Sequence, residues 1–222
     1  MAMNIQHDTP SEDGQNNYLG NRWLARNRCA PITNDQNCRL WIERLPPDCT
    51  YQNLLSSIRD VGPIYATHIV PPMAEITDVG VHPIPTSAAS VTFFSHHDAN
   101  LFLAKHAASQ FTVNGYRATI LRHRVRTVSV DVNGQSRVLI IRGHPYCVDP
   151  QWLTWLFTEK FKVHYDTDYL VYTPGRVTSE VIWAFGSFRA QAHTIYNRLT
   201  QQLSNSMTVT YGTDPCGGGN GT

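Results

Sequence analysis

The sequence has few charged residues and no long apolar segment. Lys, Arg, Asp and Glu make up 16% of its 222 residues, and the formal net charge is +1. Strong nucleic-acid binders usually carry a markedly basic domain, so any nucleic-acid site must be local. No segment approaches the roughly 20 apolar residues of a membrane span, and the polar amino terminus lacks a signal-peptide core. These absences favour an intracellular protein, in the nucleus or the cytoplasm, with no membrane partner.

Signatures of catalysis and metal binding are also missing. The five cysteines are odd in number and include no CxxC pair, which argues against a disulfide framework or a zinc knuckle. No G-x-S-x-G, Walker-type or H-E-x-x-H motif occurs. His96 and His97 are adjacent, and adjacent residues of a helix do not face one another, so we expect surface residues rather than metal ligands. We therefore expect no enzyme, cofactor, metal or small-molecule substrate.

What the sequence does contain is enough apolar material for a core, 41% of its residues. Polar residues 1–37 predict a mostly disordered tail, and residues 216–222 predict a flexible one. Between them, the alternating run RLWIERL from Arg39 predicts a half-buried strand, followed by a helix that Asp48 or Thr50 caps and Gly62 ends. The strand IYATHIV, a loop to residue 85, the strand TSAASVTFF, a helix opening with a capping box at residues 95–98, and the strand YRATILRHR complete the unit.

The same order of elements then recurs. It comprises RVLIIRG, a helix capped by Asp149, YLVYT, SEVIWAF, a helix from about Arg189 to Leu203, and SMTVTYG. The predicted fold class is α+β, with two tandem ferredoxin-like βαββαβ modules, each a four-stranded antiparallel sheet with two helices on one face. Module 1 covers residues 38–126, a linker covers 127–135, and module 2 covers 136–215.

This organisation resembles the RNA recognition motif, and the second copy, with FGSFRAQA and YGTDPC, is similar to a family of fungal proteins of that type. In the family, the second position of a hexamer on the first strand stacks a base, and LWIERL places Trp41 there. An octamer on the third strand has aromatics at its third and fifth positions, where TSAASVTF has Ala88 and Ser90. Base stacking is worth about 1–3 kcal/mol per base, so the resemblance implies weak RNA binding by module 1.

The candidate RNA-binding residues lie on or beside this sheet face: Trp41, Glu43, Arg39, Arg44, Ser90, Thr92, Arg117, Arg122, Arg124 and Arg126. Strand alternation predicts that Trp41 points outward, although it also fits an aromatic packed under the tail or the other module. Arg122, Arg124 and Arg126 alternate, so in a continuous strand they would share one face and follow phosphates. The alternative is a solvated edge strand whose charges prevent aggregation.

Module 2 keeps no aromatic residue at a stacking position. Alternation predicts an aliphatic outer face that would serve for protein contact, made of Leu139, Ile141, Ile182 and Ala184. Such a face needs a cover, which would be module 1, a terminal segment or a partner protein. Two functions therefore follow: an adaptor of modest specificity that binds single-stranded RNA through module 1, with module 2 used for packing or protein contacts, or a protein–protein scaffold that binds no RNA.

Overall fold

The computed structural model describes residues 29–77 and 80–218, and module 1 has the predicted α+β fold. Its sheet contains β1 (Arg39–Leu45), β2 (Ile64–Val70), β5 (Ser87–Phe93) and β8 (Thr119–Arg122), and its helices are α1 (Tyr51–Ser56) and α2 (His96–Ala108). The antiparallel strands lie in the order β2-β5-β1-β8, so the first and third strands of the unit are central.

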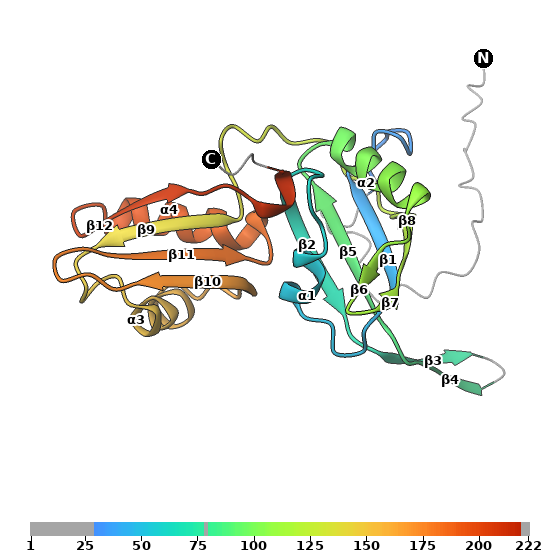
Figure 1. Ribbon diagram of the computed structural model, residues 1–222, viewed down its shortest axis with the longest axis horizontal. Coiled ribbons are helices and arrows are strands. Elements are labelled where there is room, and N and C mark those ends of the chain that lie inside the picture. The colour runs from blue at the N-terminus through green and yellow to red at the C-terminus, as the bar shows by residue number, and fades with distance from the viewer. Residues whose placement is uncertain (1–28, 78–79, 219–222) are drawn as a thin grey trace, which may run out of the picture.

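Module 2 repeats this topology in a second sheet beside the first (Figure 1). Its elements are β9 (Val138–Gly143), α3 (Pro150–Trp155), η2 (Leu156–Lys160), β10 (Thr167–Thr173), β11 (Ser179–Phe185), η3 (Phe188–Ala192), α4 (His193–Gln202) and β12 (Met207–Tyr211). The strand order β10-β11-β9-β12 matches that of module 1. No described helix is long and apolar enough to cross a membrane.

Local signals explain where several elements begin and end. Thr50 caps α1 in a reciprocal capping box with Asn53, but the helix ends at Ser56, well before the predicted end at Gly62. The predicted loop before residue 85 instead holds a projecting hairpin, β3 (Met73–Thr77) and β4 (Gly80–Ile84) (Figure 1). The loop was predicted from the prolines and glycines of this segment. Both strands of a two-stranded ribbon are edge strands, and edge strands tolerate proline.

The core of module 2 corrects the predicted outer face. Leu139 and Ile141 are fully buried, because β9 pairs them with Trp183 and Val181, which face the helices. A change of one residue in the register of a strand moves every side chain to the other face of the sheet. The run VLII is aliphatic throughout, so its sequence does not show which residues face the core. Ile182 does lie on the outer side, whereas Ala184 is fully buried.

A buried arginine ties the two modules together. The Arg137 guanidinium forms ion pairs with Asp168 of β10 at 2.8 Å and with Asp214 at 3.0 Å, and it donates to the Phe185 carbonyl at 2.9 Å. Burial acts to lower the pKa of Arg137, but Asp214, Cys216 and Asp168 outweigh it and raise the pKa. The guanidinium therefore stays charged although its side chain is fully buried.

The chain after β12 carries this network into module 1. Asp214 accepts a hydrogen bond from the Ile64 amide of β2 at 2.8 Å, and Cys216 lies fully buried in the core of module 1. The Cys216 carbonyl accepts from the Gly62 amide at 3.0 Å. A short 3-10 helix, η4 (Pro215–Gly217), therefore docks where the sequence predicted a flexible tail from residue 216.

The linker and the end of the predicted tail also pack on module 1. The Cys38 amide donates to the Thr127 carbonyl at 3.0 Å, and the Val130 amide donates to the Phe94 carbonyl at 2.8 Å. The Ala30 amide donates to the Arg126 carbonyl at 3.1 Å, so residues from 29 onward are held against module 1. Residues 1–28 of the predicted tail lie outside the described residues.

We expect Arg137→Ala to destabilise the chain strongly. The substitution leaves two carboxylates buried without their cation, which typically costs about 3–5 kcal/mol. Arg142→Ala is the matched control because Arg142 pairs with Glu180 at the surface, where an ion pair contributes about 0–1 kcal/mol. Urea unfolding measures both free energies of unfolding. Equal losses in the two variants would contradict the role given to Arg137.

Thiol reactivity tests the docking of the carboxyl-terminal segment. Burial raises the pKa of Cys216 to about 12. Burial also acts to raise the pKa of the exposed Cys29, but hydrogen bonds from Arg126 outweigh it and lower the pKa. Since iodoacetamide reacts with thiolates, we expect Cys29 to react first and Cys216 last in the folded protein, and at similar rates in denaturant. Peptide mass spectrometry measures the rates; equal native rates would contradict the docking.

Candidate nucleic-acid interface

The candidate site lies on the outer face of the module 1 sheet, which its two helices leave uncovered. The strand register places two rows of outward side chains side by side: Trp41, Ser90 and His68 in one row, and Arg39, Thr92 and Ala66 in the next. Each row crosses β1, β5 and β2 in turn, because directly opposite residues share a face. These six residues define the outer face of module 1.

The Trp41 ring is half-buried and is held from two sides. Its Nε1–H donates to the Glu43 carboxylate at 3.0 Å, and its ring meets His123 edge to face with centroids 5.8 Å apart. The strand register places it opposite Ser90 on the outer face, the orientation that alternation predicts. Both contacts restrain the side-chain torsions of Trp41.

His123 adds no positive charge to this face at neutral pH. Burial lowers its pKa to about 4, with the neighbouring positive charges of Arg39 and Arg124 contributing. A histidine with that pKa is neutral at pH 7. The positive charge near Trp41 therefore comes from arginine.

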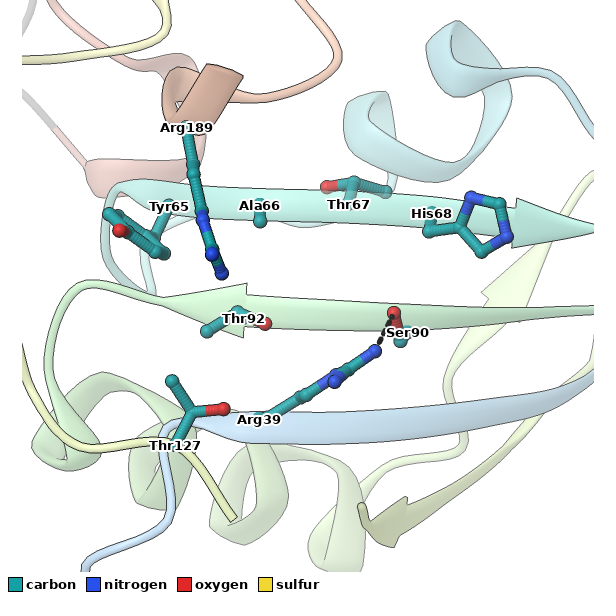
Figure 2. A pocket seen from close by; sticks show the side chains of 9 residues that line it. All are labelled: Arg39, Tyr65, Ala66, Thr67, His68, Ser90, Thr92, Thr127 and Arg189. Carbon is teal, nitrogen blue, oxygen red and sulfur yellow. Dashed lines mark hydrogen bonds between the residues drawn. The ribbon is translucent and has the colours of Figure 1, made fainter. Parts of the chain in front are cut away.

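A pocket of about 170 Å³ opens on the outer face, and guanidinium groups from both modules point into it (Figure 2). Arg39 donates to the Ser90 hydroxyl at 3.2 Å, while the Arg189 side chain crosses β2 beside Ala66 and points toward β5. The pocket is lined by nine residues: Arg39, Tyr65, Ala66, Thr67, His68, Ser90, Thr92, Thr127 and Arg189. None of the nine is acidic, so the lining favours an anion.

The segment before Arg189 explains its position. The Ser187 hydroxyl accepts from the Thr67 amide at 2.8 Å and donates to the Thr67 carbonyl at 3.1 Å, so it caps the open edge of β2. The backbone is then non-helical at Arg189, with ψ 131°, and left-handed at Ala190, with φ 63°. The predicted helix start at Arg189 is therefore wrong, since α4 begins only at His193, and the irregular turn aims Arg189 away from module 2.

The predicted basic stretch does not form one surface. Arg122 lies opposite Leu40, a core residue, and its guanidinium bonds to Asn100 of α2 and to the Asn37 carbonyl. Arg122 is thus on the helix side of the sheet, where it stabilises the fold and faces away from Trp41. Because β8 ends at this residue, the assumed alternation through to Arg126 does not continue.

The other predicted arginines are dispersed. Arg126 donates through Nε to the Cys29 thiol at 3.2 Å, and Arg124 is exposed beyond the end of β8. Arg117 is exposed in β7 (Tyr116–Arg117), a short strand that pairs with β6 (Thr112–Val113) outside the main sheet. Arg44 is exposed at a bulge of β1 with φ 62°. Of the predicted cations, Arg39 alone lines the pocket.

The sequence analysis missed several pocket residues. His68 could have been predicted, because alternation in IYATHIV places it on one face with Ala66. Arg189 and Thr127 carry no local signal, since their positions depend on how module 2 and the linker dock onto module 1. A docking-dependent position cannot be obtained from strand or helix periodicity.

The predicted surface histidines are confirmed as surface residues. His96 and His97 are exposed in the first turn of α2, and His96 Nδ1 lies 3.0 Å from the Ser129 hydroxyl of the linker. Within residues 29–77 and 80–218, no three potential metal ligands stand together.

The outer face of module 2 differs from that of module 1. Ile182 lies between Ile140 and Val171 in one aliphatic row, and Val171 is 49% exposed. This row contains no aromatic ring that could stack a base. Of the predicted protein-contact face, Ile182 is the residue that stays partly exposed on this side.

Comparisons with known proteins give matches to solved structures alone. No protein-family model and no curated protein match the chain, so the resemblance to a fungal family stays a prediction. Similar structures are RNA recognition domains 1 and 2 of Sex-lethal from Drosophila melanogaster, the first two RRM domains of yeast poly(U) binding protein Pub1, and the N-terminal three RNA binding domains of the yeast splicing factor Prp24.

Each of these structures is similar to 79% of this chain. Sex-lethal is 18% identical, with 100% of that chain covered and a TM-score of 0.28. Pub1 is 13% identical, with 99% covered and a TM-score of 0.32. Prp24 is 10% identical, with 63% covered and a TM-score of 0.29. Such low TM-scores do not support any conclusion about binding. The fold is assigned from the strand orders of the two sheets, β2-β5-β1-β8 and β10-β11-β9-β12.

Proposed function

We propose that this chain binds single-stranded RNA on the outer face of module 1, with modest specificity. The observation that carries the proposal is Trp41, an outward and partly exposed ring fixed by Glu43 and His123, with the Arg39 guanidinium two residues away on the same strand face. Aromatic rings on a sheet stack unpaired bases, and arginine binds phosphate. This pairing of groups suits a single strand with exposed bases.

The modest specificity follows from the small number of stacking groups. Ala88 and Ser90 provide no ring on β5, so Trp41 supplies the stacking on this face. Every base has a π-face, so stacking tolerates different sequences, and specificity needs hydrogen bonds to base edges. Glu43, Ser90 and Thr92 carry polar groups on this face, but Glu43 already accepts from Trp41 and Arg39 already donates to the Ser90 hydroxyl.

The proposed role of module 2 is to pack against module 1. Ser187 hydrogen-bonds directly to β2 of module 1, and Arg137 is linked to β2 through Asp214. Phe188 packs against Phe94 with ring centroids 5.1 Å apart. These contacts would hold the two modules in one arrangement around the outer face of module 1.

A protein–protein scaffold is the second candidate. The partly exposed row of Val171, Ile182 and Ile140 favours it, because an aliphatic strip on a sheet can pair with a partner. Burial of Leu139 and Ile141 makes this strip smaller than the sequence predicted. The scaffold would become the leading candidate if the wild-type chain showed no salt-dependent RNA binding at low ionic strength.

We expect Trp41→Ala to weaken RNA binding. Loss of one stacking platform corresponds to about 1–3 kcal/mol, or roughly 5- to 150-fold in the dissociation constant. Fluorescence anisotropy with a labelled single strand of random sequence measures it. Trp155→Ala is the matched control, because Trp155 is 53% exposed on α3 of module 2. Equal affinities of the two variants, with RNA still bound, would place the site elsewhere.

A further inference from the structure

We propose that the pocket between the modules is a phosphate site shared by both of them, and that bound RNA passes from module 1 to module 2 there. This inference rests on the proposed function and extends it, because it assigns module 2 a direct contact with the strand. Its ligand is one phosphate group of the RNA backbone. Arg39 and Arg189 would bind that phosphate from opposite sides of the pocket.

The lining has the chemistry of a phosphate site. Arginine presents several N–H donors in a planar fork that matches phosphate oxygens, and two arginines from different elements point into this pocket (Figure 2). The hydroxyls of Ser90, Thr92 and Thr127 add neutral donors, and no lining residue carries a negative charge to repel the ligand.

Arg189 has no evident structural task. Its side chain is exposed, and within the described residues it makes no hydrogen bond or ion pair. Its backbone is nevertheless held firmly, because Ser187 bonds to β2 and Phe188 is buried against Phe94 and Tyr65. A fixed backbone that directs a cation without a partner into a pocket of hydroxyls favours a ligand-binding role over a structural one.

The small side chain of Ala66 keeps the pocket open. Arg189 passes beside this residue, between it and Tyr65, and points toward β5 (Figure 2). A larger side chain at position 66 would fill the space between the two guanidinium groups. The pocket is lined by residues of both rows, and its Arg39 lies two residues, about 7 Å, from Trp41 along β1. A base on Trp41 and a phosphate in the pocket can therefore belong to the same short stretch of one strand.

The first test compares two arginines of module 2 by their salt dependence. For Arg189→Ala we expect roughly fivefold weaker binding of a single-stranded RNA, and a slope of log K against log salt that is smaller by about 0.7, the value for one lost phosphate contact. Arg176→Ala is the control, because Arg176 is exposed in the loop between β10 and β11. Arg189→Lys should keep most of the affinity, and Ala66→Leu should lose it without removing charge.

The second test uses inorganic phosphate and does not depend on RNA. In the wild-type chain, phosphate should shift the Nε–H NMR signals of Arg39 and Arg189, and Ala66→Leu should abolish both shifts. If phosphate leaves both signals unchanged, or if Arg189→Ala and Arg176→Ala bind RNA with equal affinity and slope, the shared site is refuted while Trp41-dependent binding can still stand. If phosphate shifts both signals but RNA does not bind, the pocket stands and the proposed function fails.

Discussion

The buried ion network of Arg137 is the constraint on which the arrangement of the two modules depends. Its guanidinium joins β10 to the segment after β12 through Asp168 and Asp214, and Asp214 also binds the first residue of β2 in module 1. A buried charge is tolerated when it is paired and fully hydrogen-bonded, and this one meets two carboxylates and a carbonyl. Ser187 and Phe188 add further contacts between the modules at β2 and Phe94.

The outer face of module 2 differs from that of module 1, and its tyrosine, Tyr169, lies at one end, opposite Ala184. Its β9 and β11 place their large side chains, Leu139, Ile141 and Trp183, in the core, and the outer row is short and aliphatic. At its other end, module 2 instead presents Ser187, Phe188 and Arg189 to module 1. Two modules of the same topology therefore have different surfaces: one has an aromatic and basic face, and the other a docking end.

Periodicity predicted the order of the elements well, because strand alternation and helical spacing are local properties. The outward position of Trp41 followed from the apolar neighbours Leu40 and Ile42 in the same way. Periodicity failed where the local signal was uniform, as in the VLII run of β9, or where a strand ended early, as β8 does at Arg122. It could not reach Arg189 or Cys216, whose positions depend on contacts between segments more than 100 residues apart.

The most direct measurement of the central claim is a map of amide chemical-shift changes in the full chain as a short single-stranded RNA is added. Binding on the outer face of module 1 predicts that the changes concentrate in β1 and β5 around Trp41 and Ser90, and extend to η3 of module 2. Changes confined to the outer row around Ile182, or no changes at low salt, would contradict it.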